Sequence, residues 1–286
     1  MPHSAHVELS HVALATAVLY LGGAVALGPS ALVSEPRVLA PLLVLVCVAA
    51  VAHHRSEQAP GPFAALAPIA MWPLLYDGFV QVASLRPDRF IDRALAHADA
   101  TLFHRLPGPP SWPLGGGMEE VANLFYASFY FVIPGAMLAI WRARGTEAAA
   151  RYSLSVLVAQ ALCGALWLLF PAGGYHLSGS PLSAAAGPST ALVRAIYAAN
   201  PHYAAAFPSS HVALATVAAL MLVWNDGSRA WPLWSLGIAF ATIYGQYHYA
   251  VDAPPAVLVA VAAVTFVLRD QLPQLAADRL QRTATT

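Results

Sequence analysis

The sequence has 286 residues, of which 58% are hydrophobic and only 10% carry a charge. A soluble globular domain carries about 25% charged residues. This composition therefore excludes an ordinary water-soluble fold and predicts an integral membrane protein. The formal net charge is zero, so nothing in the charge balance indicates a nucleic-acid partner.

Eight apolar stretches approach the roughly 17–25 residues that a membrane-spanning helix needs. They cover residues 9–28, 37–53, 63–85, 119–141, 152–171, 209–225, 230–248 and 253–269. Stretch 63–85 contains Asp77 and several prolines, which leaves open whether it spans fully. The sequence thus predicts an all-α polytopic bundle with six to eight spans.

Two long connections interrupt the spans. In the connection 86–118, apolar residues recur on one helical face, and charged residues lie opposite them: Arg89, Asp92, Arg93 and Asp99. That pattern is typical of an amphipathic helix in the membrane interface. The connection 172–207 is rich in Gly, Ser, Pro and Ala, and we expect it to cover the same end of the bundle.

The chain divides into an N-terminal transmembrane hairpin (1–60), a core (61–272) and a tail (273–286). Around the last four spans, one end holds only Arg194. The other end and the tail hold Arg142, Arg144, Arg151, Arg229, Arg269, Arg279 and Arg282. Because arginine accumulates on the cytoplasmic side, we expect a cytoplasmic tail. The expected location is a bacterial plasma membrane.

Two short motifs carry the residues with catalytic potential. Residues 207–211 read Phe-Pro-Ser-Ser-His, and residues 245–252 read Gly-Gln-Tyr-His-Tyr-Ala-Val-Asp. The two spans between them cross the membrane and return, so His211 and His248 should emerge on the same, extracytoplasmic face. Two imidazoles and one carboxylate in one pocket would suit phosphate-ester chemistry on a lipid.

The spacing suggests a role for each motif residue. Four residues separate His248 from Asp252, which places both on one helix face. The carboxylate can accept a hydrogen bond from one imidazole nitrogen, leaving the other to attack phosphorus. His211 can protonate the leaving alkoxide. Ser209, the expected N-cap, and Ser210 can hold phosphate oxygens at the start of the next helix.

Each motif alone has a simpler interpretation. A histidine near a helix end is more often an interfacial residue, and a serine before a helix is often only a cap. A metal site formed by His211, His248 and Asp252 is a third interpretation, although catalytic zinc usually takes three positioned protein ligands plus water. The joint occurrence of both motifs favours catalysis, with no metal and no organic cofactor implied.

The motifs resemble those of the type 2 phosphatidic acid phosphatase superfamily, and most closely its inositolphosphotransferase-like branch, which includes inositol phosphorylceramide synthases. The resemblance rests on residues 200–213 and 245–252 and extends more weakly over about 70–270. It implies a six-helix core and a phosphohistidine intermediate on His248. It also implies that Asp252 orients His248 and that His211 protonates the leaving group.

Three positions depart from the family pattern. Ser210 stands where glycine is usual, Thr242 where phosphatases place an arginine, and Phe79 where the first motif would have a basic residue. Because such sites depend on electrostatic stabilisation, we expect another cation to take part. The candidates are Arg194, Arg86, Arg89, Arg93 and Arg105.

Other polar residues have less specific signals. Glu119 and Glu120 are candidates for binding a headgroup, with acidic stabilisation of a helix N-terminus as an equally good alternative. Tyr249 is a further headgroup candidate. Tyr126 and Tyr130 lie one helical turn apart, which is more typical of packing than of chemistry.

The sequence as a whole predicts a phosphotransferase that moves a phospho-headgroup, with phosphoinositol as the candidate, between membrane lipids. The missing arginines and the resemblance favour this reading. A lipid phosphate or prenyl diphosphate phosphatase with the same His-His-Asp triad is the alternative. A non-catalytic membrane transporter or scaffold is a third hypothesis.

Overall fold

The computed structural model describes residues 5–28, 36–55, 61–103, 116–174, 187–199, 203–226 and 230–271. Several sequence predictions fall outside these ranges: Arg105, most of the Pro/Gly-rich stretch before residue 116, residues 175–186, Asn200–Pro201, Arg229 and the tail 273–286.

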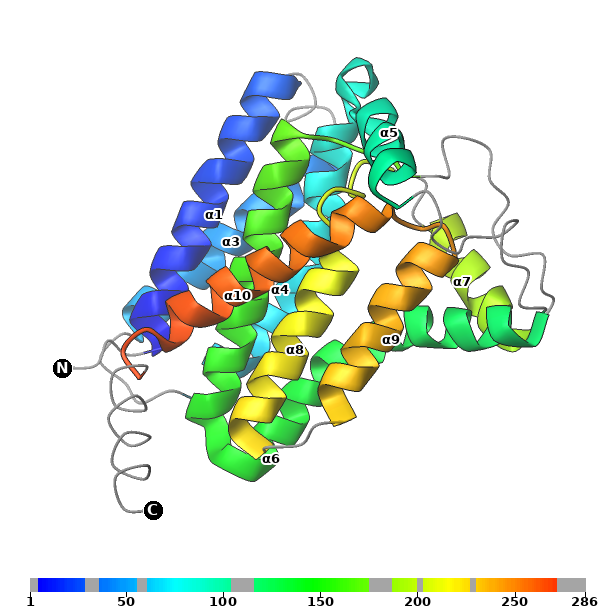
Figure 1. Ribbon diagram of the computed structural model, residues 1–286. Coiled ribbons are helices and arrows are strands. Elements are labelled where there is room, and N and C mark those ends of the chain that lie inside the picture. The colour runs from blue at the N-terminus through cyan, green and yellow to red at the C-terminus, as the bar shows by residue number, and fades with distance from the viewer. Residues whose placement is uncertain are drawn as a thin grey trace, which may run out of the picture.

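The described residues form a helical bundle without a named strand (Figure 1). The longer helices are α1 (Ala5–Leu27), α3 (Pro36–His54), α4 (Pro62–Ser84), α6 (Gly116–Leu169), α8 (Ser210–Asp226), α9 (Ala230–Tyr244) and α10 (Ala253–Leu268). Shorter elements connect them: η1 (Pro87–Arg89), α5 (Asp92–Leu102), α7 (Pro188–Ala199) and η3 (Ala250–Asp252). The predicted all-α class is confirmed.

Among the described residues, four helical segments are long and apolar enough to cross a membrane: Val7–Leu27, Pro62–Ser84, Gly116–Leu169 and Ala250–Leu268. The apolar helices α3, α8 and α9 are shorter. Helix α4 runs without interruption through Pro68 and Pro73, so the uncertain third stretch forms a helix of full spanning length.

Helix α6 contains two of the predicted spans. Its 54 residues bend at Gly145, which has φ 82° and ψ −176°, a conformation that glycine adopts at little cost. The hydroxyl of Tyr152 donates a hydrogen bond across the bend to the carbonyl of Ile133, 2.9 Å away. The stretches 119–141 and 152–171 are therefore the two arms of one bent helix.

Helix α8 lies at the centre of the arrangement that positions the histidines. It packs against α6, α9 and α10, and α10 crosses it obliquely in Figure 1. Helix α4 packs along α6 on another side, and α1 and α3 pack against each other. The first turn of α8 carries His211, so the residue is held by a helix with neighbours on several sides.

Helix α9 ends earlier than predicted. We expected a span over 230–248, but α9 ends at Tyr244 and residues 245–249 form a tight loop in which Gln246 has φ 55°. His248 lies in this loop and Asp252 lies in η3. The prediction that both share one helix face is therefore wrong, and the loop brings them together instead.

Candidate active site

The structure places His211 and His248 beside each other. His211 comes from the start of α8 and His248 from the loop after α9, and their ring centroids are 5.7 Å apart with the planes inclined at 60°. The two residues are only 4% and 6% exposed. Both line one cavity, which is what a reaction at a shared phosphorus atom requires.

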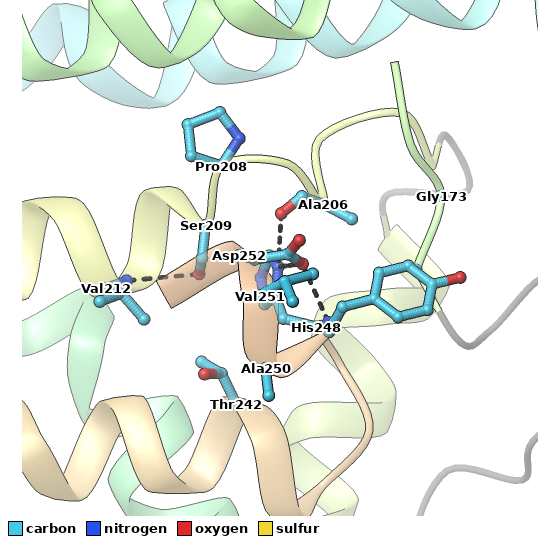
Figure 2. A network of polar contacts seen from close by, with 12 residues as sticks. Gly173, Ala206, Pro208, Ser209, Val212, Thr242, His248, Ala250, Val251 and Asp252 are labelled. Carbon is cyan, nitrogen blue, oxygen red and sulfur yellow. Dashed lines mark hydrogen bonds and ion pairs between the residues drawn. The ribbon is translucent and has the colours of Figure 1, made fainter. Parts of the chain in front are cut away.

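His248 is oriented mainly by a backbone carbonyl. Its Nδ1 lies 2.9 Å from the oxygen of Ala206 and 3.4 Å from Oδ2 of Asp252; Figure 2 shows both groups beside the ring. Since a carbonyl only accepts, we assign the proton to Nδ1. Nε2 is then the nitrogen with a lone pair. The sequence had predicted the carboxylate as the orienting group and missed the carbonyl.

Asp252 is buried and only partly hydrogen-bonded. Its Oδ2 accepts a hydrogen bond from the backbone N–H of Tyr249 at 2.9 Å. Within the described part of the chain, Oδ1 has no hydrogen-bond partner. A carboxylate buried in this way can respond to a positive charge on the neighbouring imidazole.

Thr242, at the position where the family pattern has an arginine, makes its hydrogen bonds with backbone groups. The carbonyl of Thr242 accepts hydrogen bonds from the N–H groups of Tyr247 and His248, at 3.0 and 3.1 Å. The hydroxyl of Thr242 donates to the carbonyl of Ala239 at 2.8 Å, and the residue is fully buried. Thr242 therefore fixes the loop that carries His248.

The serines before His211 face the protein interior. Ser209 Oγ accepts a hydrogen bond from the N–H of Val212 at 3.4 Å, the N-cap arrangement that the sequence predicts. Both Ser209 and Ser210 are buried, and neither is among the residues that line the cavity. Neither hydroxyl therefore faces this cavity, and the role of the serines in binding phosphate stays a prediction.

The segment before these serines is tied to the end of α6. The carbonyl of Ala172 accepts a hydrogen bond from the N–H of Ala206 at 2.8 Å. The indole N–H of Trp167 donates to the carbonyl of Pro208 at 3.1 Å. The peptide bond between Phe207 and Pro208 is cis. These contacts fix the carbonyl of Ala206 where it meets His248.

His211 has no hydrogen-bond partner at either ring nitrogen among the described residues. Its ring packs against those of Tyr126 and Phe129, with centroid distances of 4.5 and 4.3 Å. Because buried polar groups are normally bonded, an imidazole held only by aromatic rings is available to a ligand.

The cavity beside the histidines is small and lined by phenols. Its volume is about 40 Å³, whereas a cavity needs about 10–15 Å³ to hold one water. Besides the histidines, the lining consists of Gly173, Ala204, Ala205, Ala206, Tyr76, Tyr126, Tyr197, Tyr203 and Tyr247. The histidines therefore face a small cavity with a largely aromatic wall.

The tyrosines that line the cavity could not be identified from the sequence. Tyr126, expected only to pack, both stacks on His211 and lines the cavity. Burial raises the pKa of Tyr197 and of Tyr247 well above the ordinary phenol value, so both remain protonated donors. The sequence signal for Tyr126 was that it shares one helical face with Tyr130.

None of the candidate arginines in the described ranges lines the cavity. Arg86 pairs with Asp88 at 2.9 Å on the surface, and Arg89 and Arg93 are exposed. Arg194 is exposed on α7. Its charge lowers the pKa of Tyr247, but burial raises that pKa by more.

Glu120 caps the N-terminus of α7. Its carboxylate accepts hydrogen bonds from the N–H groups of Gly187 and Ser189, at 3.1 and 2.9 Å. The hydroxyls of Ser189 and Thr190 donate to the same group. The capping alternative therefore describes Glu120, although the capped helix is α7 and not its own. Glu119 is half-buried, and its charge acts on Tyr247.

Asn123 links this cap to the histidine loop. Its amide nitrogen donates to the hydroxyl of Thr190 at 2.7 Å, and its amide oxygen accepts from the hydroxyl of Tyr247 at 2.6 Å. Asn123 is only 1% exposed. The start of α7 and the residue before His248 are therefore joined through one buried amide.

Helix α5 turns its acidic residues toward the site, whereas the sequence suggested a solvated charged face. Asp92 accepts hydrogen bonds from the N–H groups of Gly173 and Gly174 and from the hydroxyl of Tyr249, at 2.8–2.9 Å. Tyr249 is thus engaged by Asp92. Gly174 has φ 81°, and a Cβ there would lie 2.9 Å from the carbonyl of Tyr247.

Asp99, two turns further along α5, holds η3. Its carboxylate accepts hydrogen bonds from the N–H groups of Ala250 and Val251, at 2.8 and 2.9 Å. These N–H groups lie at the N-terminus of η3. A negative charge is favourable at the N-terminus of a helix. Helix α5 therefore helps to position the catalytic candidates.

Among the described residues, no group of three or more His, Cys, Asp or Glu side chains is arranged to hold a metal ion.

The apolar helices and the buried histidine pair together define an all-α membrane bundle with a histidine-lined cavity at one end. The family model of the PAP2 superfamily matches residues 115–266, more than half of the chain, and the match includes both histidines and Asp252. The chain belongs to the PAP2 superfamily. No curated protein and no solved structure matches it. Membership suggests phosphatase or phosphotransferase activity on lipids, and with the apolar helices it suggests an integral membrane protein.

Proposed function

We propose that this protein is a membrane phosphotransferase that moves a phospho-headgroup from a phospholipid donor to a lipid alcohol through a covalent intermediate on His248. The observation that carries the proposal is the pair of imidazoles, 5.7 Å apart, that line one cavity. Nε2 of His248 is the proposed nucleophile, because Nδ1 faces Ala206 and Asp252.

In the first step, Nε2 of His248 attacks phosphorus while the bond from phosphorus to the leaving lipid oxygen breaks. His211 gives its proton to that oxygen, so the donor leaves as a neutral alcohol. Such proton transfer typically contributes 10²- to 10⁴-fold to the rate. The positive charge that forms on the His248 ring lies beside the carboxylate of Asp252, 3.4 Å from Nδ1.

In the second step, His211, now neutral, takes the proton of the acceptor hydroxyl as the acceptor oxygen attacks phosphorus. The bond from Nε2 to phosphorus breaks, and His248 and His211 return to their starting protonation states. A lipid hydroxyl gives transfer, and a water molecule gives hydrolysis.

The side chains that line the cavity offer an alternative to the missing arginine. Transition states for phosphoryl transfer need hydrogen-bond donors aimed at the phosphoryl oxygens. Tyr126 and Tyr197 lie beside the pair, and we propose that the hydroxyl of Tyr197 supplies part of this stabilisation. Arg194 remains a candidate for a distal contact with the headgroup phosphate.

Transfer is favoured over hydrolysis by the character of the cavity. A cavity wall formed mostly by tyrosine and alanine side chains would exclude much of the water once a lipid headgroup is bound. Phosphoinositol is the proposed headgroup on resemblance alone. The proposed site of action is the extracytoplasmic leaflet of a bacterial plasma membrane, based on the arginine distribution.

The test is to incubate the purified protein with a phospholipid radiolabelled in its headgroup phosphate, with and without ceramide or diacylglycerol. Transfer predicts a new labelled lipid that depends on the acceptor. Release of water-soluble phosphate regardless of acceptor would instead establish the phosphatase alternative. If neither product forms and His248→Ala takes up no less label than the wild type, the enzymatic proposal is wrong and a transporter or scaffold remains.

A further inference from the structure

A second pocket opens at the opposite end of the bundle from the histidines. It lies where α6 bends and where α8 and α10 end, and its volume is about 350 Å³. His211 is at the start of α8 and Asn225, which lines this pocket, is near its end. The rise of an α-helix separates them by roughly 21 Å. This pocket is therefore distinct from the candidate active site.

The pocket has an excess of positive charge. Arg144, Arg151 and Glu147 line it, so two guanidinium groups face one carboxylate. Arg151 pairs with Glu147 at 2.6 Å. The Nε–H of Arg144 donates to the carbonyl of Asn225 at 2.7 Å, which orients the guanidinium at the C-terminal end of α8, where a cation is favourable.

The rest of the pocket is partly apolar. Met221, Trp224 and Leu268 contribute to its lining, and the Trp224 side chain is 40% exposed. Tryptophan is typical of the boundary between the hydrocarbon core and the headgroups. Cationic groups next to an apolar wall match the two parts of a phospholipid, its phosphate and its acyl chains.

We propose that this pocket binds the phosphate group of an anionic membrane phospholipid, with the phosphate on Arg144 and Arg151 and the acyl chains along Met221, Trp224 and Leu268. Basic pockets between transmembrane helices on the cytoplasmic side recognise lipid headgroups in this way. Free phosphate esters share the same polar chemistry. The apolar wall favours the lipid as the source. This site does not depend on the proposed enzymatic activity.

The test is a titration of the purified full-length protein with short-chain phosphatidylglycerol and, separately, phosphatidylcholine, followed by native mass spectrometry and thermal unfolding. We expect phosphatidylglycerol to bind at least tenfold more tightly and to raise the unfolding temperature. Arg144→Gln with Arg151→Gln should remove the preference. Arg142→Gln, a change in the same segment outside the pocket lining, is the matched control and should keep it.

A variant that should bind more tightly distinguishes a specific effect on the pocket from misfolding of the protein. Glu147→Gln removes the carboxylate that competes for Arg151, so it should tighten phosphatidylglycerol binding several-fold. Glycerol phosphate forms a separate arm: equal binding of this free ester would establish a phosphate site and overturn the lipid as its source. Equal binding of both lipids, or an equal loss in Arg142→Gln, would overturn the proposal.

Discussion

The rings of Tyr126 and His211 stack, with their centroids 4.5 Å apart and their planes inclined at only 21°. The hydroxyl of Tyr126 is 3.0 Å from that of Tyr197 on α7. The proposed general acid is thus held by ring contacts, since its nitrogens have no hydrogen-bond partner among the described residues. Its orientation depends on the shape of the aromatic cluster.

This stacking makes a first prediction. Tyr126→Phe keeps the ring and should retain His211 in place, whereas Tyr126→Ala should lower kcat roughly three- to tenfold, because an aromatic pair contributes about 0.5–1.5 kcal/mol. Turnover of a labelled phospholipid measures both variants. If Tyr126→Phe is as impaired as Tyr126→Ala, the hydroxyl and not the ring is the important group.

The two histidines should differ in their dependence on the leaving group. His248→Ala should abolish turnover with every substrate, because it removes the nucleophile. His211→Ala should slow a lipid alkoxide by about 10²- to 10⁴-fold but affect a p-nitrophenyl phosphodiester much less, since nitrophenolate leaves without a proton. An equal loss on both substrates would contradict the role of His211 as general acid.

The rate should depend on pH through both imidazoles. Attack requires neutral His248, so the rate should fall at acidic pH as this ring gains a proton. Departure of the alkoxide requires protonated His211, so the rate should also fall at alkaline pH, giving a bell-shaped profile. The alkaline limb should be absent in His211→Ala assayed with the nitrophenyl substrate.

Asp252 should stabilise the positive charge on His248 more than it fixes the position of the ring. Because the carbonyl of Ala206 already accepts the closest contact from Nδ1, Asp252→Asn should leave the ring in place and reduce kcat by roughly 10- to 100-fold, the range for a hydrogen bond to a charged group. KM should change little. A large rise in KM with unchanged kcat would show that the residue positions substrate instead.

The contacts of Asp99 predict a structural effect transmitted to the site. Asp99→Ala removes the acceptor for two N–H groups of η3 and should lower the free energy of unfolding by about 1.5–3 kcal/mol, with slower turnover. Asp88→Asn is the matched surface control, since its partner Arg86 is exposed, and should have almost no effect. Thermal unfolding in detergent measures both variants.

Much of the fold could be predicted from the sequence because apolar stretches of spanning length have few alternatives in a membrane. Helix bounds agree with the predicted stretches to within one residue for α3, α4, α8 and α10, whereas α1 begins four residues earlier than predicted. The end of α9 was predicted four residues too late, because Gly245 and the aromatic residues after it continue the apolar pattern without revealing the turn. The bend at Gly145 likewise depends on one backbone conformation that composition does not specify.

Residues of the site could be predicted from the sequence only where they belong to short local motifs. The pairing of His211 with His248 followed from the helical hairpin between them. The contribution of the Ala206 carbonyl could not be predicted, because every residue carries a carbonyl and only the fold selects one. The same holds for Asp99, whose position on an amphipathic helix indicated solvent exposure, whereas tertiary contacts turn it toward η3.

The amide of Asn123 has a consequence for how a lipid gains access. It joins Thr190 at the start of α7 to Tyr247, the residue before the nucleophile, and α7 also carries Tyr197 into the lining of the cavity. A headgroup that pushes α7 aside must strain this amide and thereby act on the loop that holds His248. In the proposed reaction, entry of the headgroup and alignment of Nε2 of His248 would then be coupled.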